Sequence, residues 1–287
     1  MTLRALLVYK RSTLEMLRRA GRLPGLRAKD PSFVRRLERS DLRHKDSLRV
    51  VKRELLSRRW QVSEVHRAGL TSAQGAQLVV SVGGDGTFLE AARVAGDVPV
   101  VSVNSDPVES VAHFSACEAK GFGRLLDRWM DGTLSFVRLR RLEVRGSFGN
   151  ELVLNDALLA HRNPAAATRL LVRLGGKTSE IKGSGLWVST AAGSPAAARS
   201  SGGLVLPALS RRWQVVFRET YTPRGLVKRL LLGPRDHFKV VNRSEDAWLY
   251  LDGSHRRVSV GAGETLVFRP SGRDVLAVWP SQRRRLG

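Results

Sequence analysis

Cysteine is almost absent from this chain of 287 residues, in which Cys117 is the single example. One cysteine excludes an internal disulfide and suits a reducing compartment, so we expect a cytoplasmic protein. The sequence also lacks an apolar run of the roughly 18 residues that a membrane-spanning helix needs. We therefore expect no membrane partner. The apolar stretch in the opening MTLRALLVYKRS is too short for a targeting peptide and favours a first core strand at residues 6–9.

Negative charge is scarce, because 26 Asp and Glu stand against 49 Lys and Arg, for a net charge of +23. Such an excess indicates anionic partners, whether nucleotides, polyphosphate, nucleic acid or acidic surfaces. The basic residues are nevertheless spread along the sequence, and no arginine block of the kind that grips nucleic acid stands out. We interpret the charge as a solvated surface and expect no nucleic-acid partner.

The first half of the chain alternates strand-like and helix-like segments. Continuous apolar runs such as LVVSV at 78–82 are typical of strands that are buried on both faces of a parallel sheet. The predicted strands are 6–9, 62–65, 78–82 and 98–103, and the predicted helices are 46–60, 87–96 and 122–130. This alternation predicts an α/β nucleotide-binding domain with a parallel sheet over residues 1–132.

After residue 132 the sequence changes to short runs that are rich in Thr, Val, Ser and Gly. Turn signals such as Asp252-Gly253 separate these runs. The pattern predicts a β-rich, antiparallel β-sandwich-like domain over residues 133–267.

A glycine-rich motif is the first candidate for a functional site. Gly83, Gly84, Asp85, Gly86 and Thr87 stand between the buried run LVVSV and the start of a helix. Glycines let the backbone approach a phosphate chain closely, and the N–H groups of such a turn and helix start bind anions. The carboxyl ends of parallel strands are also where open α/β sheets bind ligands.

Asp85 is the unusual member of the motif, because phosphate repels a carboxylate. It can accept the proton of an alcohol that attacks a phosphate, or engage a magnesium ion, or do both. The alternative is a plain turn in which Asp85 caps the helix. The preceding strand, the following helix and a second polar site favour the chemical interpretation.

The second site begins in the run ELVLNDALLAHR, where Asn155 and Asp156 interrupt an apolar strand without Gly or Pro. Adjacent strand residues face opposite ways, so at least one of these polar groups points inward and needs a partner. A bulge in an edge strand is the alternative. A third element, KGSGLWVSTAAGSPAAARSSGG at 182–203, leads from a buried strand into small residues and hydroxyls. These suit a flat polar ligand, or equally a packed helix contact.

These three elements, in this order and spacing, resemble the NAD kinase family. GGDGTFLEAAR is similar to the family's GGDGT segment, Asn155-Asp156 to its Asn-Glu pair, and GSGLWVSTAAGS to its GDG…ST-x-x-GS segment. The opening LLVYKRS, the stretch VNSDPVESVAHF and Ser184 resemble the mitochondrial-type branch more closely. The resemblance covers most of the chain.

The resemblance implies the two-domain NAD kinase/diacylglycerol kinase-like fold, in which a segment at about 268–287 returns to the first domain. It implies transfer of the γ-phosphate of ATP to the 2′-hydroxyl of the adenosine ribose of NAD, which gives NADP. ATP and magnesium, or another divalent cation bound through the ATP phosphates, are the implied cofactors, without metal ligands from the protein. A homodimer or homotetramer, with the site near a subunit interface, is implied as well.

Residue roles come from the same resemblance. Asp85 would be the catalytic proton acceptor. The implied substrate- and nucleotide-binding residues are Gly83, Gly84, Gly86, Thr87, Asn104, Asn155, Asp156, Lys182, Ser184, Thr190, Gly193, Ser194 and Ala196. For Asn104, a simple turn at the following Ser-Asp-Pro is an alternative.

The chain departs from the family pattern in its acceptor pocket. Asp156 replaces a glutamate and is one methylene shorter, and Ser184 replaces an aspartate. Pro195 and Ala197 stand where the common members have Thr and Tyr, so an aromatic platform is missing. These changes leave NAD, NADH and related nucleosides open as acceptors.

Two alternative functions remain open. Lipid kinases of the diacylglycerol or sphingosine type share the GGDGT start, but they continue it with Asn-Glu. This chain continues it with Phe88-Leu89-Glu90 and has no obvious amphipathic membrane-docking helix. A non-catalytic nucleotide-binding regulator is the other alternative, against which the retained Asp85 argues.

Overall fold

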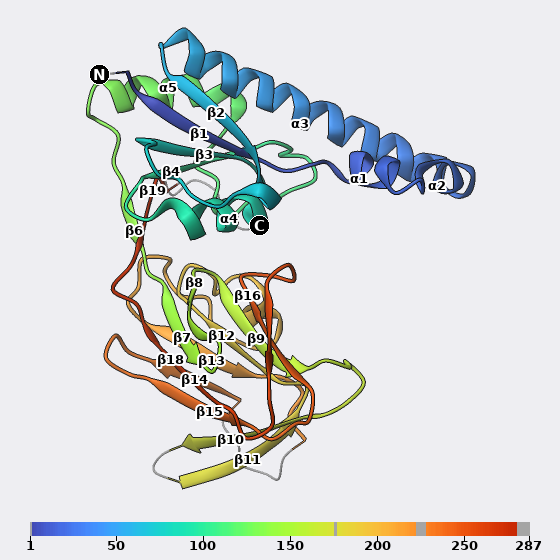
Figure 1. Ribbon diagram of the computed structural model, residues 1–287, viewed down its shortest axis with the longest axis vertical. Coiled ribbons are helices and arrows are strands. Elements are labelled where there is room, and N and C mark those ends of the chain that lie inside the picture. The colour runs from blue at the N-terminus through green and yellow to red at the C-terminus, as the bar shows by residue number, and fades with distance from the viewer. Residues whose placement is uncertain (1, 175–176, 222–227, 280–287) are drawn as a thin grey trace. The chain divides into compact units, whose positions relative to one another are not determined.

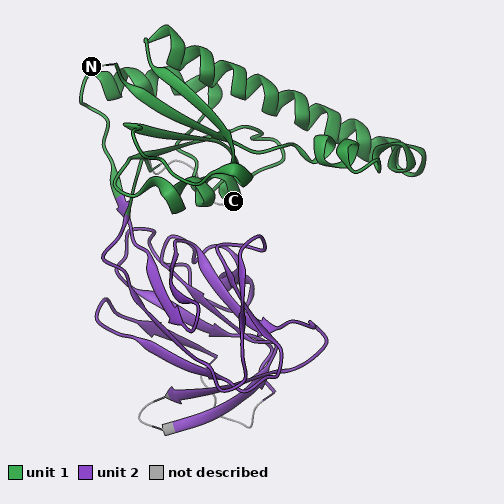
Figure 2. Ribbon diagram, in the orientation of Figure 1, with its two compact units in different colours: residues 1–137, 275–287 green, residues 138–274 purple. Residues whose placement is uncertain are grey.

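The computed structural model describes residues 2–174, 177–221 and 228–279, and the chain divides into two compact units (Figure 2). Unit 1 comprises Met1–Val137 with Val275–Gly287, and unit 2 comprises Arg138–Asp274. Unit 1 combines helices with a parallel sheet, and unit 2 consists mainly of antiparallel sheets. The predicted fold class is therefore confirmed.

The sheet of unit 1 has the strand order β2-β1-β3-β4-β19 (Figure 1). The short strand β5 pairs with β4. These strands pair in parallel, and every residue of the central β3 and β4 is buried, as the continuous apolar runs predicted. The strands are β1 (Arg4–Tyr9), β2 (Gln61–His66), β3 (Leu78–Gly83), β4 (Val100–Asn104), β5 (Cys117–Glu118) and β19 (Val275–Ala277), and β6 (Val137–Leu139) spans the unit boundary.

Helices cover both faces of this sheet, with α3 and α5 on one face and α4 on the other (Figure 1). Leu55 of α3 and Phe122 of α5 share one apolar core with Val80 and Val103 of the sheet. The helices are α1 (Thr13–Arg19), α2 (Leu23–Lys29), α3 (Pro31–Ser57), the 3-10 turn η1 (Arg67–Gly69), α4 (Asp85–Ala95) and α5 (Ala119–Met130). None of the helices among the described residues is long and apolar enough to cross a membrane.

The helix α3 begins 15 residues earlier than the predicted start at residue 46, so that boundary was wrong. The side chain of Asp30 caps the helix by accepting a hydrogen bond from the N–H of Phe33 at 2.9 Å, and Pro31 occupies the first turn. The first half of α3 buries few apolar side chains besides Val34, so its apolar periodicity is weak.

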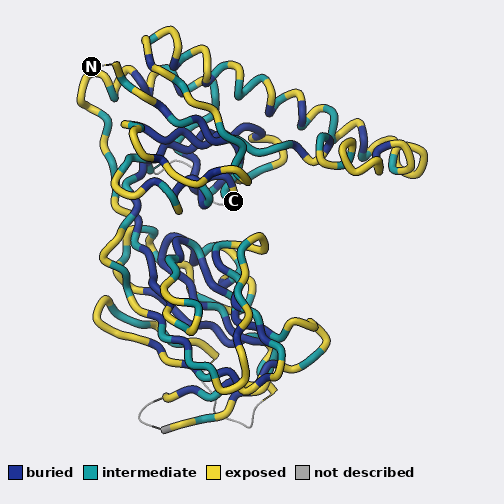
Figure 3. Tube along the Cα trace, in the orientation of Figure 1, coloured by how far each residue is buried: buried dark blue, intermediate teal, exposed yellow. Residues whose placement is uncertain are grey.

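Unit 2 contains two antiparallel sheets, with strand orders β11-β10-β15-β18-β7-β8 and β14-β13-β12-β9-β16-β17 over the described residues. Buried side chains from both sheets, among them Trp213, Phe238 and Phe268, form one core. Figure 3 shows the buried stretches of the chain in dark blue. The elements are β7 (Leu142–Gly146), β8 (Gly149–Val153), β9 (Asp156–His161), β10 (Thr168–Leu174), β11 (Lys177–Gly183), β12 (Leu186–Ser189), α6 (Ala197–Ser200), β13 (Trp213–Phe217), β14 (Arg229–Leu232), β15 (Phe238–Asn242), β16 (Ala247–Leu251), β17 (Arg257–Val260) and β18 (Thr265–Pro270).

The segment 268–287, expected to return to the first domain, is divided between the two units. Its first residues complete β18 in unit 2, and Val275–Ala277 forms β19 beside β4 in unit 1. Residues 280–287 of that segment lie outside the described residues.

Candidate active site

The glycine-rich motif forms the turn from β3 into α4. Gly83 is the last residue of β3, Gly84 is the N-cap, and α4 begins at Asp85. A Cβ atom on Gly83 would lie 2.2 Å from Oγ1 of Thr87, and one on Gly84 would lie 2.9 Å from Oγ of Ser110. A side chain at Gly83 would therefore force the buried Thr87 to move, whereas one at Gly84 would displace only the hydroxyl of Ser110. The first N–H groups of a helix have no partner within it, so this turn presents donors to an anion.

Two further members of the motif line the same turn. Thr87 is buried, and its Oγ1 has no hydrogen-bond partner among the described residues. Gly86 is exposed, and a Cβ atom there would lie 3.2 Å from Nη1 of Arg67. A buried hydroxyl without a partner costs free energy, so the hydroxyl of Thr87 is a site where a ligand atom would be stabilising.

The carboxylate of Asp85 is held in one orientation by the loop that follows β4. Its Oδ1 accepts a hydrogen bond from the N–H of Phe114 at 2.9 Å, and its Oδ2 accepts one from the N–H of His113 at 3.0 Å. An ionised carboxylate offers about four lone-pair positions, so two remain for a substrate proton. The side chain is half-buried, and its place in the first turn of α4 favours negative charge.

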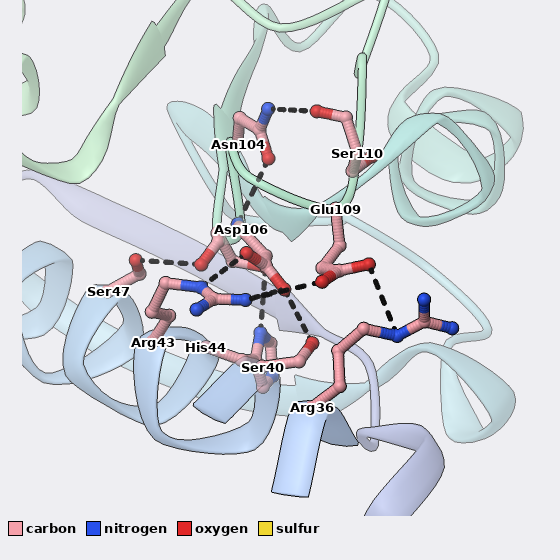
Figure 4. A network of polar contacts seen from close by, with 10 residues as sticks. Arg36, Ser40, Arg43, His44, Ser47, Asn104, Asp106, Glu109 and Ser110 are labelled. Atoms are coloured by element: carbon pink, nitrogen blue, oxygen red, sulfur yellow. Dashed lines mark hydrogen bonds and ion pairs between the residues drawn. The ribbon is translucent and has the colours of Figure 1, made fainter. Parts of the chain in front are cut away.

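Asn104, at the carboxyl end of β4, is paired in register with Gly83. Its buried side chain donates from Nδ2 to the carbonyl of Ser110 at 2.9 Å, and its Oδ1 accepts from the N–H of Asp106 at 3.0 Å (Figure 4). Asn104 therefore shapes the loop that supplies the two amides to Asp85.

Asp106 ties this loop to α3. Its carboxylate accepts hydrogen bonds from Nε of Arg43 at 2.6 Å and from Oγ of Ser40 at 2.5 Å (Figure 4). Burial opposes the ionisation of Asp106, but the hydrogen bonds and charge of Arg43 and Ser40 outweigh it, so the pKa of Asp106 is lowered. The loop is thus anchored by an ionised, buried carboxylate.

His44 of α3 joins two strand ends at the same edge of the sheet. Its Nε2 lies 2.9 Å from the carbonyl oxygen of Lys10, just after β1, and its Nδ1 lies 2.8 Å from Oγ of Ser105, just after β4. Burial lowers the pKa of His44, which keeps the ring neutral. The neutral ring therefore donates from Nε2 to Lys10 and accepts at Nδ1 from Ser105.

The second predicted site lies in unit 2, where Leu154 and Asn155 connect β8 to β9. The carboxylate of Asp252 accepts hydrogen bonds from the N–H of Leu154 at 3.0 Å and from the N–H of Asn155 at 2.6 Å. The N–H of Asp252 in turn donates to the carbonyl of Asp156 at 2.9 Å. These bonds explain how an apolar run is broken here without Gly or Pro, since a distant carboxylate satisfies the freed amides.

Two carboxyl groups meet at this connection. Burial, together with the charge of Asp252, raises the pKa of Asp156 to about 7. Burial likewise raises the pKa of Asp252 to about 6, although its hydrogen bonds from backbone N–H groups oppose that shift. Asn155 donates from Nδ2 to Oδ2 of Asp156 at 3.1 Å. Asp156 and Asp252 therefore both titrate near neutral pH, and Asn155 is hydrogen-bonded to the former.

The turn after β12 packs against the same connection. Oγ1 of Thr190 donates to the carbonyl of Leu154 at 2.6 Å and accepts from the N–H of Gly193 at 3.0 Å. A Cβ atom on Gly193 would lie 2.0 Å from the carbonyl oxygen of Asn155. Only glycine fits, and the contact brings the predicted residues Asn155, Asp156, Thr190 and Gly193 together.

Ser194 and Ala196 continue this turn. Ser194 is fully buried, and its Oγ donates to the carbonyl of Ala191 at 2.7 Å and accepts from the N–H of Leu206 at 2.8 Å. Its hydroxyl is thus used in holding the turn. Ala196 is exposed at the end of the turn and offers open surface.

Lys182 and Ser184 lie at the other end of β12, which spans about 10 Å at the usual rise per residue. Lys182 is exposed, with its Nζ 5.7 Å from the centre of the Tyr221 ring. The N–H of Ser184 donates to the carbonyl of Arg218 at 3.0 Å. Within one copy of unit 2, these two residues are not gathered with Asn155, and their predicted role stays a prediction.

An arginine-lined cavity of about 90 Å³ lies in unit 2. Its walls include Thr190 and Ala191 of the turn after β12, and four arginines. The arginines are Arg140, Arg141, Arg211 and Arg212. Positive charge therefore lies beside the turn that holds Asn155.

Sequence reasoning missed several contributors. Asp252 was noticed only as part of a hairpin, although its φ of 51° shows that it holds a special position. Lys10 and Arg67 follow the first two strands of unit 1, and the strand order places them at the edge that carries the glycine turn. The amides of His113 and Phe114 carry no side-chain signal. The only signal in the sequence for Lys10 and Arg67 was that these basic residues stand just after the predicted strands 6–9 and 62–65.

A glycine turn carries an oriented carboxylate at the edge of a parallel sheet, and the antiparallel unit that follows in sequence carries the half-buried Asn155 next to the buried Asp156. This is an arrangement that a phosphotransferase can use. The family model for the ATP-NAD kinase N-terminal domain matches residues 34–134.

Relatives extend the similarity over most of the chain. A probable NADH kinase from Oryza sativa subsp. japonica is 34% identical over 84% of this chain and 83% of its own length. An NADH kinase from Arabidopsis thaliana is 31% identical over 83% and 84%, and an NAD kinase from Thermotoga neapolitana is 30% identical over 80% and 90%. The chain belongs to the NAD kinase family, as its motifs predicted, and it is a phosphotransferase. The plant relatives fit the mitochondrial-type branch.

Solved structures share the fold. The crystal structure of an NAD kinase from Archaeoglobus fulgidus in complex with ATP superposes with a TM-score of 0.70 at 19% identity, over 98% of this chain and 95% of that one. The yeast NADH kinase complexed with NADH gives a TM-score of 0.67 at 17% identity, over 99% and 85%.

Proposed function

We propose that this protein transfers the γ-phosphate of ATP to the 2′-hydroxyl of the adenosine ribose of NAD, with NADP and ADP as products. The observation that carries the proposal is the carboxylate of Asp85, which two backbone amides orient at the start of α4. A fixed carboxylate with free lone pairs beside an anion-binding turn is the arrangement that an alcohol nucleophile needs.

The reaction proceeds in one displacement. The 2′-oxygen attacks the γ-phosphorus, the bond from that phosphorus to the β–γ bridging oxygen breaks, and ADP leaves. Asp85 accepts the hydroxyl proton and later releases it to water. The backbone at Gly83, Gly84 and Gly86 and the hydroxyl of Thr87 bind the phosphate oxygens. Magnesium arrives with ATP as the MgATP substrate and neutralises phosphate charge.

Asn155, which directly precedes β9, and Asp156, its first residue, bind the dinucleotide. Their side chains exchange hydrogen bonds with its ribose hydroxyls. The turn that contains Thr190, Gly193, Ser194 and Ala196 lies along the dinucleotide. The buried carboxyl of Asp156, at 4% exposure, supports this role, because its burial costs free energy that hydrogen bonds to a ligand would offset.

A homodimer or homotetramer is part of the proposal. The side chains of Leu158, Trp187, Trp248 and Tyr250 alternate with core residues of their strands, so they lie on the outer face of a sheet in unit 2. Trp248 and Tyr250 stack with centroids 6.4 Å apart. Such an aromatic face suits a contact between copies, and the copies would let Lys182 and Ser184 serve a neighbour's dinucleotide. The single cysteine supports a cytoplasmic location.

NADH is a second candidate acceptor, favoured because both plant relatives carry the name NADH kinase. The shorter Asp156 and the missing aromatic platform leave room for either nicotinamide ring.

A coupled assay with MgATP separates the candidates. NAD, NADH and diacylglycerol are offered to the wild-type protein and to Asp85→Asn, and product is measured for each. We expect turnover on a dinucleotide, and a loss of about 100-fold or more in kcat for Asp85→Asn with ATP binding retained. Turnover on diacylglycerol alone would reject the dinucleotide, and ATP binding without turnover on any acceptor would indicate a regulator.

A further inference from the structure

Lys10 stands beside the glycine turn. It follows β1 directly, and the last residue of β1, Tyr9, is paired in register with Val82 of β3. The next step along both strands therefore places Lys10 beside Gly83, at the carboxyl edge of the sheet. The hydrogen bond from Nε2 of His44 to its carbonyl fixes the backbone there.

The ammonium group of Lys10 lacks any hydrogen bond or ion pair across the described residues, although the side chain is half-buried. Burial lowers its pKa, the positive charge of Arg67 lowers it further, and Asp106 opposes the shift. Asp106 is itself already bound by Arg43 and Ser40. Lys10 is thus a desolvated cation, and the charged group with the largest effect on its pKa is another cation, Arg67.

Arg67 approaches the same turn from the other outer strand. It begins η1, directly after β2, and its Nη1 lies 3.2 Å from the position that a Cβ atom on Gly86 would occupy. In the strand order β2-β1-β3-β4, Arg67 and Lys10 come from one side of the turn. The amides that hold Asp85 come from the β4 side. The glycine turn, which includes Asp85, therefore has the two cations on its β1 side and the orienting amides of His113 and Phe114 on its β4 side.

A desolvated ammonium group such as that of Lys10 is electrostatically unfavourable unless an anion compensates it. The donor's triphosphate carries several negative charges and would lie on the amides of the glycine turn, beside Lys10 and Arg67. We propose that Lys10 and Arg67 bind the phosphate chain of the nucleoside triphosphate donor, at the β1–β2 side of the glycine turn. This inference rests on the proposed function in one respect, the identity of the donor. It adds two residues outside the GGDGT motif to the phosphate site.

The dinucleotide acceptor also carries a pyrophosphate, which is the same chemistry from a second source. The geometry favours the donor, because both cations lie at the turn whose amides face an anion. Separate titrations of ATP, inorganic tripolyphosphate and NAD tell the two sources apart.

The test compares Lys10→Met, which keeps the stem but removes the charge, with Lys10→Arg and with a control, Lys120→Met. Lys120 is a highly exposed lysine of α5 that pairs with Glu118. Binding is measured by calorimetry on the full chain. We expect Lys10→Met to weaken ATP and tripolyphosphate by about 10- to 100-fold, Lys10→Arg by about 3-fold, and Lys120→Met by less than about 2-fold. NAD binding should be unchanged in all three.

Unchanged ATP and tripolyphosphate binding in Lys10→Met would overturn the proposal, and weakening of NAD alone would reassign the cations to the acceptor. If Lys10→Met fails to fold, Lys10→Gln and Arg67→Met provide the same comparison. A salt titration of the wild type adds an independent readout, since ATP affinity should fall less steeply with salt in each charge-removing variant. The outcome does not depend on turnover, so a failure of the dinucleotide assignment remains distinguishable.

Discussion

Arg43 donates from Nε to Oδ1 of Asp106 at 2.6 Å, and this bond joins the long helix α3 to the loop whose amides hold Asp85. The hydrogen bonds to the carboxylate of Asp85 come from His113 and Phe114 rather than from these two residues. Both act through the position of the loop.

We expect Arg43→Ala to lower kcat and to destabilise the fold by about 1–3 kcal/mol, because it leaves the buried carboxylate of Asp106 short of a charged partner. Arg43→Lys should recover part of both losses. The matched control is Arg36→Ala, whose guanidinium is largely exposed and lies 3.9 Å from Glu109. Steady-state kinetics and thermal unfolding measure the effect, and an equal loss in Arg36→Ala would contradict the special role of Arg43.

Thr87→Val tests whether the unpartnered hydroxyl serves a ligand. The variant removes a buried hydroxyl that has no hydrogen-bond partner among the described residues, so the free energy of unfolding should stay constant or rise. ATP binding should weaken, because the hydroxyl would no longer meet a phosphate oxygen. Thr190→Val is the control and should destabilise the protein, since that hydroxyl makes two close hydrogen bonds. Full ATP affinity in Thr87→Val would remove Thr87 from the phosphate site.

Gly193→Ala should disrupt the dinucleotide half of the site. The new methyl group would need space 2.0 Å from the carbonyl oxygen of Asn155, and backbone must move to supply it. We expect a lower melting temperature and a higher KM for the dinucleotide. Gly25→Ala in α2 has open space around it and should be neutral or stabilise the protein by about 0.5–1 kcal/mol. A dinucleotide KM that matches the wild type would show that the turn is not part of the pocket.

The pKa of Asp156 predicts a pH dependence of stability. In the folded protein this pKa is raised from 3.8 to about 7, so the native state holds a proton that the unfolded chain has lost between about pH 4 and 7. The free energy of unfolding should therefore fall as the pH rises through this window, by at most about 1.4 kcal/mol per pH unit.

Asp156→Asn removes this pH dependence because an amide does not titrate. Denaturant unfolding at pH 5 and pH 8 should show the variant gaining stability relative to the wild type at the higher pH. Asp252 titrates in the same region, so Asp156→Asn reports the contribution of one member of the pair. An identical pH profile for both proteins would contradict the burial of an ionisable Asp156.

Much of unit 1 could be predicted because its signals are local. Buried parallel strands appear as continuous apolar runs, and the turn at Gly83 to Gly86 is specified by adjacent residues. The beginning of α3 was not predicted, since its apolar face is narrow and only the capping pair of Asp30 and Pro31 indicates it.

The remaining features depend on contacts between distant parts of the sequence. Asp252 caps Asn155 from 97 positions away, so nothing near Asn155 indicates its partner. Lys10 lies near the glycine turn only because β1 pairs with β3, and strand order is a property of the sheet as a whole. The family resemblance supplied Thr190 and Gly193, which residue types alone left open between a ligand pocket and a packed helix.

The imidazole of His44 bonds at once to the end of β1 and to the end of β4, two strands that β3 separates. One rigid aromatic ring therefore bridges the backbone of Lys10 and the start of the loop that orients Asp85. His44 thus ties α3 to both strand ends, on either side of the glycine turn that follows β3.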